Sequence, residues 1–270
     1  MTTSRDFTGK VVLITGSSGG IGAVTAVEFA RLGAQVVVTG RGKDRVSAVA
    51  KRCTEASPTG AKALEVVADV TNDDDCHRLV TDTIKTFKKL DILVNNAGRS
   101  IKSSIWDEDV LDKYELNMNT NLRSVVWLTH LCVEHLEKTK GNIVNVSSVA
   151  SFKPGASISC YSMSKCAINT FTKCMAVELA PKKIRVNAVC KLIPATIHTP
   201  AFEAIFNVTG DRLEAFKQRL AVKYPIGRIG EPSDVANAVV HLASEHATFI
   251  TGAYMLVDGG YLTGSVKMRT

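Results

Sequence analysis

Short apolar runs rich in β-branched residues alternate with longer amphipathic stretches along the whole chain. Each short run is apolar almost throughout, which is typical of strands in a parallel sheet covered on both faces. The predicted strands span residues 11–15, 35–39, 63–67, 91–95, 142–147, 185–189 and 254–257, and the predicted helices span residues 20–32, 43–55, 73–88, 107–138, 159–180 and 232–244. The alternation predicts an α/β fold, a doubly wound parallel sheet of about seven strands with helices on both faces.

No linker rich in Gly, Ser or Pro and no fixed-period repeat divides the sequence, so we expect a single domain over residues 1–270. The least regular segment, 191–224, contains Pro194 and Pro200 and follows the sixth predicted strand. Ligands bind at the carboxyl edge of such sheets, and this segment is therefore the predicted substrate lid. The alternative is a surface excursion without a function.

Composition and charge exclude several classes of protein. The chain is 45% hydrophobic and 22% charged, as in ordinary globular proteins. Its formal charge of +7 is scattered among acidic residues without a basic run, which argues against a nucleic-acid partner. The seven cysteines show no Cys-x-x-Cys spacing, and neither a disulfide framework nor a zinc site is indicated. No stretch is long and apolar enough for a signal peptide or a membrane span, and we expect a cytoplasmic protein.

A glycine-rich turn follows the first predicted strand and opens the first predicted helix. Glycines in such a turn allow the backbone to approach a pyrophosphate closely, and the helix N-terminus favours its charge. The residues predicted to bind a dinucleotide here are Gly16, Ser18, Gly20, Ile21 and Gly22. Taken alone, the turn is equally consistent with a tight strand-to-helix connection that binds nothing.

The end of the second predicted strand bears on which dinucleotide is bound. A carboxylate is expected there when the ribose 2′-hydroxyl of NAD is bound. Gly40 offers no such acceptor, whereas Arg41 supplies a planar cation suited to the 2′-phosphate of NADP. NADP(H) is therefore the preferred cofactor and NAD(H) the alternative, in which case Arg41 faces solvent.

Two further strand ends complete the predicted cofactor site. Asp69 and Val70 follow the third strand, where a carboxylate lies within reach of an adenine amino group. Asn95, Ala97 and Gly98 follow the fourth strand, where small and amide residues either hydrogen-bond within the sheet or let the cofactor approach the backbone.

A phenol, an ammonium group and a hydroxyl form the candidate reaction centre. A free tyrosine has a pKa of about 10 and needs a cation beside it to transfer protons at neutral pH. Tyr161 and Lys165 are four residues apart, which places them on one face of a helix. Ser148 ends the fifth predicted strand and would hydrogen-bond the same substrate oxygen. Taken alone, a Tyr-x-x-x-Lys pair is more often plain surface pairing.

With these motifs assembled, the chain resembles the short-chain dehydrogenase/reductase family, in its small single-domain branch with a Rossmann fold. The resemblance runs from Gly9-Lys10-Val11 to Val257-Asp258-Gly259-Gly260 and includes Pro225-Ile226-Gly227-Arg228. It implies that Tyr161 is the general acid of carbonyl reduction and the general base of alcohol oxidation, and that Lys165 lowers its pKa and holds the nicotinamide ribose.

The same resemblance assigns three more roles. Ser148 would orient the substrate oxygen, with Ser147 as the adjacent competitor that the family spacing disfavours. Asn121 would anchor the water of a proton relay, and Asp69 would bind adenine. The resemblance also implies a homotetramer or homodimer that packs across residues 121–137 and 161–179.

Two positions depart from the family pattern. Members that prefer NADP often carry a basic residue where this chain has Gly19, so the cofactor preference rests on Arg41. The turn after the sixth strand carries about three extra residues, and Ala195 replaces a glycine within the segment 191–195. The family's nicotinamide contacts then fall on Pro194, Ile197 and Thr199.

The expected function is that of an NADP-dependent carbonyl reductase or dehydrogenase, which transfers a hydride between nicotinamide and a carbonyl or secondary alcohol. The substrate classes left open are 3-oxoacyl thioesters, steroid-like or retinoid-like carbonyls, small diketones and sugars. The altered turn suggests a second hypothesis, a cofactor-binding or scaffold protein that has lost turnover. A metal enzyme built on His130 and His135 is disfavoured, because a spacing of five residues puts them on different helix faces.

Overall fold

Parallel strands with nearly continuous apolar sequence build the centre of the molecule, as seen in a computed structural model that describes residues 5–192 and 211–264. The seven-stranded sheet has the order β3-β2-β1-β4-β5-β6-β7, with every neighbouring pair parallel. The strands are β1 (Val11–Ile14), β2 (Gln35–Gly40), β3 (Leu64–Val67), β4 (Ile92–Asn95), β5 (Asn142–Ser148), β6 (Arg185–Lys191) and β7 (Tyr254–Val257). The predicted doubly wound fold is confirmed.

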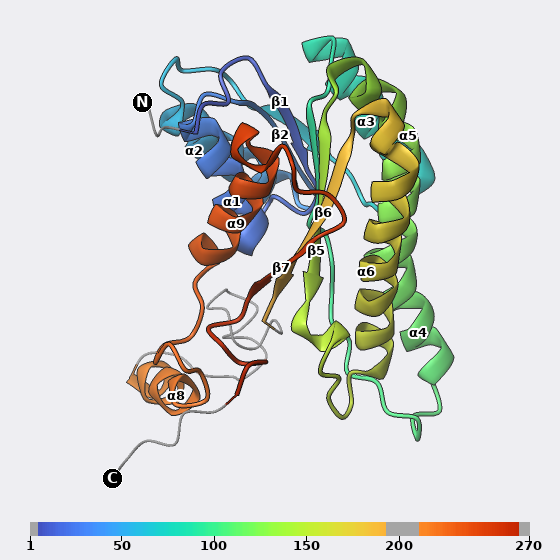
Figure 1. Cartoon of the computed structure of the whole chain (residues 1–270), viewed down its shortest axis with the longest axis vertical. Helices are drawn as coiled ribbons and strands as arrows, with labels where there is room; N and C mark the ends of the chain where they lie inside the picture. Colours follow the sequence, from blue (N-terminus) through green and yellow to red (C-terminus); the bar gives the residue numbers. More distant parts are fainter. Residues whose placement is uncertain (1–4, 193–210, 265–270) are drawn as a thin grey trace.

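Helices cover both faces of the sheet (Figure 1). One face carries α1 (Gly20–Arg31), α2 (Lys43–Ala56) and α9 (Pro232–Ala243), and the other carries α3 (Asp73–Phe87), α5 (Ser124–Thr139) and α6 (Ser159–Leu179). Each layer buries its own apolar cluster, one around Phe29 and Val239 and the other around Leu93 and Leu136. No described helix is long and apolar enough to cross a membrane.

The stretch predicted as one long helix, 107–138, forms three pieces instead. It comprises α4 (Val110–Met118), a π-helical turn η1 (Asn119–Arg123) and α5. The wider turn changes the direction in which its side chains point, and it buries Asn121 completely.

Strand β6 also differs from its prediction, because it continues through Lys191 and pairs that residue with Ser148 of β5 and Val257 of β7. Beyond it, α8 (Asp211–Ala221) lies within the segment predicted to be a lid. The lid itself stays a prediction, because residues 193–210 are outside the described part of the chain.

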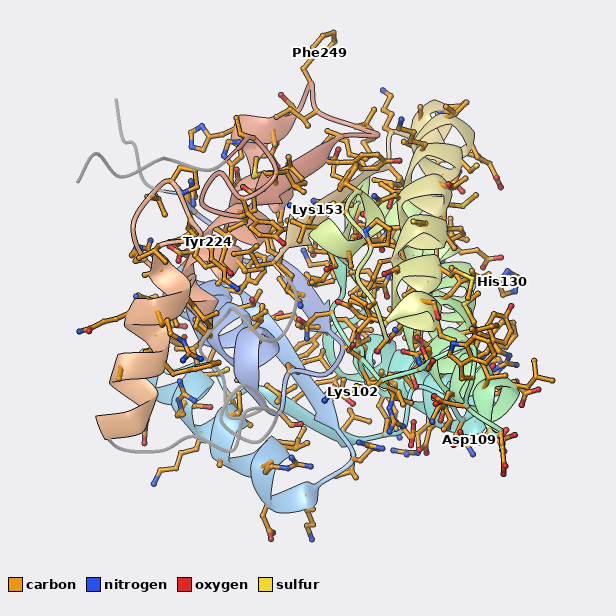
Figure 2. The ribbon with its side chains drawn as sticks, turned by 90° about the horizontal axis from the view of Figure 1, so that it is seen from below. Lys102, Asp109, His130, Lys153, Tyr224 and Phe249 are labelled. Atoms are coloured by element: carbon orange, nitrogen blue, oxygen red, sulfur yellow. The ribbon has the colours of Figure 1, made fainter. Side chains whose placement is uncertain are left out.

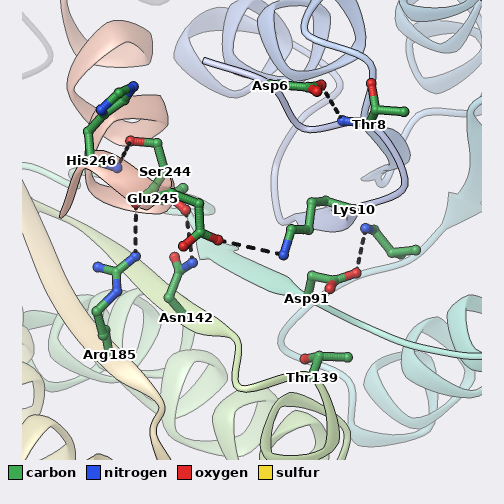
Figure 3. Close-up of polar contacts among 12 residues, drawn as sticks. Asp6, Thr8, Lys10, Asp91, Thr139, Asn142, Arg185, Ser244, Glu245 and His246 are labelled. Atoms are coloured by element: carbon green, nitrogen blue, oxygen red, sulfur yellow. Dashed lines mark hydrogen bonds and ion pairs between the residues drawn. The ribbon is translucent and has the colours of Figure 1, made fainter. Parts of the chain in front are cut away.

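The amino edge of the sheet is closed by polar contacts between distant segments (Figure 3). Asp91 Oδ2 accepts a hydrogen bond of 2.8 Å from the backbone N–H of Val11, and Lys10 pairs with Glu245 at 3.7 Å. The guanidinium of Arg185 donates to the carbonyl of Leu242 in the last turn of α9 at 2.9 Å and to that of Ile250 beyond the helix at 3.2 Å. These contacts hold strands and loops in place at the edge opposite the predicted ligand site.

Candidate active site

A cavity of about 960 Å³ opens at the carboxyl edge of the sheet, beside the glycine turn. Its volume suits a ligand the size of a cofactor. The lining residues come from the ends of β1, β2, β3, β4 and β6 and from the region of η1, and they are Gly16, Ser18, Gly19, Gly20, Ile21, Gly22, Thr39, Gly40, Arg41, Arg45, Ala68, Asp69, Val70, Thr71, Asn96, Ala97, Gly98, Arg99, Leu116, Asn119, Thr120 and Lys191. The structure thus brings together predicted cofactor residues from four separate strand ends, those of β1, β2, β3 and β4.

At two positions the glycine turn has no room for any side chain. Gly16 has a φ of +63°, and a Cβ there would lie 2.9 Å from Cα of Ala97. A Cβ at Gly22 would lie 2.5 Å from both Asn96 Nδ2 and the carbonyl oxygen of Gly16. Asn96 Nδ2 in turn donates to the carbonyl of Thr15 at 2.8 Å. The turn and the loop after β4 therefore hold one another in shape around the cavity.

Two arginines line the cavity at the end of β2. Arg41 lies there with an exposed side chain, and Arg45 joins it from the first turn of α2; the pairing of Arg41 with a 2′-phosphate stays a prediction. The guanidinium of Arg45 packs beside Gly42, where an added Cβ would lie 3.0 Å from Nε. The sequence analysis did not predict a cofactor-binding role for Arg45. Its position four residues after Arg41, at the start of a helix, could have indicated that the two side chains lie on the same side of the chain.

The carboxylate of Asp69 is fixed by the turn that follows β3. Asp69 Oδ1 accepts from the backbone N–H of Thr71 at 2.9 Å and from its hydroxyl at 2.8 Å. Val70 lies beside it on the cavity wall. The two residues therefore stand at the adenosine end of the predicted dinucleotide site.

The residues of the Asn-Asn-Ala-Gly element divide between two tasks. Asn95 is buried in the sheet, where its Nδ2 donates to Asn145 Oδ1 at 2.9 Å, and it does not line the cavity. Ala97 and Gly98 do line the cavity, and the Ala97 N–H donates to Thr15 Oγ1 at 2.9 Å. Of the alternatives left open by the sequence, the sheet-stabilising one applies to Asn95.

Ser148, Tyr161 and Lys165 gather at the carboxyl end of β5. Ser148 ends the strand, and the other two lie one helical turn apart near the start of α6. All three side chains are buried, with Tyr161 only 2% exposed. The Ser148 hydroxyl lies close enough to the phenol of Tyr161 to lower its pKa, whereas Ser147 donates to the backbone carbonyl of Lys165 at 3.3 Å. Ser148, and not its neighbour, is therefore the serine that acts on the phenol.

The electrostatics of this centre differ from the expectation that Lys165 lowers the pKa of Tyr161. Burial raises the pKa of Tyr161 to about 12, although the hydrogen bond from Ser148 opposes the rise. Lys165 Nζ donates to the carbonyl of Val146 at 2.8 Å and lies 5.8 Å from the centre of the Tyr161 ring. Burial also lowers the pKa of Lys165, to about 8. The phenol is therefore held in its protonated, proton-donating form at neutral pH.

Asn121 joins the loop after β4 to helix α6. Its Nδ2 donates to the Arg99 carbonyl at 2.9 Å and to Ser164 Oγ at 3.0 Å, and its Oδ1 accepts from the Arg99 N–H at 2.8 Å. A Cβ added at Gly98 would lie 3.2 Å from Asn121 Oδ1 and 3.5 Å from Lys165 Nζ. Asn121 thus stands beside the lysine of the reaction centre. Its proposed anchoring of a water stays a prediction.

Lys191 is a lining residue whose part in the cavity the sequence reading missed. Its side chain is buried, its Nζ donates to the Leu192 carbonyl at 3.3 Å, and burial together with the charge of Lys165 lowers its pKa to about 7. The sequence does place a lysine directly after an apolar strand and within the altered turn, and this position could have indicated that Lys191 lies at the ligand site. The predicted nicotinamide contacts Pro194, Ile197 and Thr199 lie outside the described residues.

The histidine alternative finds no support in the geometry. His130 projects from the outer side of its helix (Figure 2), where its ring stacks on Trp127 at 5.2 Å between centroids. Among the described residues, no three His, Cys, Asp or Glu side chains converge as a metal site would require.

Comparison with known proteins gives matches along nearly the whole chain. The sequence profile of a family described as "Enoyl-(Acyl carrier protein) reductase" matches residues 16–262. L-fucose dehydrogenase from Bos taurus is 34% identical over 254 residues, which are 94% of this chain and 90% of that protein. A short-chain dehydrogenase/reductase of unknown function from Caenorhabditis elegans, solved with cofactor, has a TM-score of 0.85 and 34% identity, covering 95% of this chain and 96% of that one.

A further solved structure is a 7α-hydroxysteroid dehydrogenase complexed with NADH and 7-oxo glycochenodeoxycholic acid. It has a TM-score of 0.85 and 29% identity, with 95% of this chain and 96% of that chain covered. Fold, site and matches together define an α/β oxidoreductase. The chain belongs to the short-chain dehydrogenase/reductase family, whose members use nicotinamide cofactors and act on alcohol and carbonyl groups.

Proposed function

We propose that this protein is an NADP(H)-dependent oxidoreductase that interconverts a carbonyl compound and a secondary alcohol, with Tyr161 as the general acid and base. The observation that carries the proposal is the buried cluster of Ser148, Tyr161 and Lys165, at the same sheet edge as the glycine-lined cavity.

The residues present fit a nicotinamide dinucleotide. The N-terminus of α1 lines the cavity and has neither a side-chain cap nor an acidic residue in its first turn, which leaves its backbone N–H groups available to a pyrophosphate. Among the described lining residues, Arg41, Arg45, Arg99 and Lys191 are cationic and Asp69 is the one acid. The excess of positive charge matches the negative charge of a phosphorylated dinucleotide.

The proposed chemistry assigns one task to each group. A bound nicotinamide supplies or accepts the hydride. In the reduction, the protonated Tyr161 hydroxyl donates its proton to the carbonyl oxygen as the hydride reaches the carbon, which leaves an alcohol and a phenolate. Ser148 hydrogen-bonds the same oxygen and fixes its direction. Lys165, one helical turn from Tyr161, would bind the ribose of the nicotinamide.

Preference for NADP(H) is supported by Arg41 and Arg45, which bring two guanidinium groups to the end of β2. Planar guanidinium groups bind phosphate oxygens with charge-assisted hydrogen bonds. Gly40 strengthens the case, because a Cβ there would collide with Ser18 Oγ, so a carboxylate for the 2′-hydroxyl of NAD has no room at this position.

Subunit association on the α5 and α6 face is part of the same proposal. The two helices lie on the same side of the sheet (Figure 1) and expose apolar side chains, among them Val126, Met163 and Val177. Burial of such a face against a second copy of the chain would remove it from water.

A carbonyl screen tests the proposal. Purified protein is mixed with NADPH or NADH and matched panels of 3-oxoacyl thioesters, polycyclic ketones, small diketones and sugars, and oxidation of the nicotinamide is followed at ~340 nm. We expect turnover of at least one panel with NADPH. Tight cofactor binding without any turnover would support the scaffold hypothesis instead.

A further inference from the structure

Lys191 is placed at the reacting end of the site by the register of the sheet. It is the last residue of β6 and lies directly opposite Ser148 in the parallel β5–β6 ladder. Neighbouring strands are about 4.8 Å apart, and residues in register place their side chains on the same face of the sheet. Lys191 is 9% exposed and forms part of the cavity wall. Its side chain therefore leaves the sheet on the same face as that of Ser148, the residue proposed to hold a carbonyl oxygen together with Tyr161.

This ammonium group has no counter-charge in the part of the chain that the structure describes. Its hydrogen bond goes to the carbonyl of Leu192 at 3.3 Å, and the charge that acts on it most is the like charge of Lys165. Burial and that repulsion explain why its pKa is lowered to about 7. A buried cation without an anion beside it acts strongly on any charge that enters the same space.

The phosphate groups of a dinucleotide are too far away to be the partner of Lys191. The glycine turn lies at the end of β1, and β1 is separated from β6 by β4 and β5. Three strand spacings amount to about 14 Å, whereas an extended lysine side chain reaches about 6 Å. The part of a dinucleotide that enters the reach of Lys191 is the ring that must approach the substrate carbon to about 3.5 Å.

We propose that Lys191 makes this site discriminate between the redox forms of the cofactor, favouring the reduced, uncharged dihydronicotinamide over the oxidised, cationic ring. The inference rests on the proposed function, because it presumes that a nicotinamide binds here. Two positive charges separated by about 6–8 Å, at an effective dielectric constant near 20, repel one another enough to weaken binding of the oxidised form by about 30- to 100-fold if both stay charged. Because the pKa of Lys191 is about 7, Lys191 can release its proton when the oxidised form binds, and at pH 6.5 this limits the weakening to about fourfold. A site with this bias binds the hydride donor and releases the spent cofactor, as a reductase requires.

Equilibrium binding tests the proposal without any substrate. Calorimetric titration at pH 6.5 gives dissociation constants for NADPH, NADP⁺, NADH and NAD⁺ with the wild-type protein, Lys191→Met and Lys191→Gln. Lys138→Met is the matched control, since Lys138 is exposed in the last turn of α5 and outside the cavity lining. Circular dichroism establishes that each variant is folded.

We expect the wild-type protein and the Lys138 variant to prefer the reduced forms. Both neutral variants at position 191 should lose about fourfold of that preference at pH 6.5, mainly because the oxidised forms bind more tightly. Equal weakening of both redox forms would overturn the proposal, and so would an unchanged ratio. If the wild-type protein bound none of the four dinucleotides, the proposed function itself would fail, which is a different outcome from binding without discrimination.

Discussion

Asn121 and Arg99 are joined by a reciprocal pair of hydrogen bonds, in which the amide of Asn121 donates to the Arg99 carbonyl at 2.9 Å and accepts from its N–H at 2.8 Å. The pair ties the π-helical turn to the loop that carries Gly98, beside Lys165 Nζ. The position of the cavity wall therefore depends on one buried amide.

Replacing this amide should destabilise the protein. Asn121→Ala leaves the N–H and the carbonyl of Arg99 and the Ser164 hydroxyl without this partner, and we expect a loss of roughly 2–4 kcal/mol in the free energy of unfolding. Urea unfolding followed by circular dichroism measures the loss. Asn119→Ala is the control, because Asn119 belongs to the same turn but is exposed. Equal effects of the two variants would contradict a specific role of the Asn121 pair.

Replacement by alanine should have different effects at two glycines of the glycine-rich turn. A Cβ at Gly22 meets Asn96 Nδ2 and the Gly16 carbonyl at 2.5 Å, whereas a Cβ at Gly19 meets nothing within 4 Å. We therefore expect Gly22→Ala to weaken dinucleotide binding at least tenfold and to lower the melting temperature, and Gly19→Ala to leave the melting temperature unchanged. Fluorescence titration with NADPH and thermal unfolding provide the two readouts. Normal binding by Gly22→Ala would show that the turn does not hold the pyrophosphate.

Removing Arg41 should reduce the preference for the phosphorylated cofactor. Arg41→Ala should weaken NADPH binding about tenfold or more and leave NADH binding unchanged, because charge-assisted hydrogen bonds to the 2′-phosphate are lost. Arg45→Ala should have a smaller effect, and the double variant should bind both cofactors alike. The control is Arg52→Ala, exposed on the same helix and outside the cavity lining. An unchanged NADPH to NADH ratio in the double variant would contradict the assignment.

The order and types of the main elements could be predicted from the sequence because apolar strands and amphipathic helices leave different periodicities. The π-helical turn at Asn121 could not, since it interrupts a helix without changing residue type and depends on tertiary hydrogen bonds of its side chain. The continuation of β6 to Lys191 was missed for a related reason. Lysine is rarely buried, so the apolar pattern seemed to end before it.

Among the site residues, too, some features could be predicted from the sequence and others depend on tertiary contacts. The glycine turn, Ser148, Tyr161 and Lys165 follow from local spacing, and the structure brings them to one edge of the sheet. The raised pKa of Tyr161 could not be foreseen, because it results from complete burial and from the direction of Lys165 Nζ towards the Val146 carbonyl. Sequence spacing gives the face of a helix but not the depth at which that face is buried.

The buried ammonium of Lys191 should make stability depend on pH. Its pKa is about 7 in the folded protein and about 10.4 in an unfolded chain, so the unfolded state binds more protons between these values and stability rises with pH. At pH 7 and below, Lys191→Met should therefore raise the free energy of unfolding by roughly 1–3 kcal/mol. The gain should shrink as the pH is raised to about 9.5, where the folded lysine is already neutral.

Urea unfolding of the two proteins at several pH values measures this difference. Lys138→Met again serves as the control and should show no pH-dependent gain. A destabilising Lys191→Met at pH 7 would mean that the ammonium group has a stabilising partner in solution.

The most direct test of the central claim compares the wild-type protein with Tyr161→Phe, which removes one hydroxyl from a buried side chain. Dissociation constants for NADPH and rates of carbonyl-dependent NADPH oxidation are measured on both proteins with the same substrate. We predict a dissociation constant within about twofold of the wild-type value and a turnover number lower by a factor of about 10²–10⁴, the range expected for loss of a general acid. Turnover at the wild-type rate in Tyr161→Phe would contradict the account.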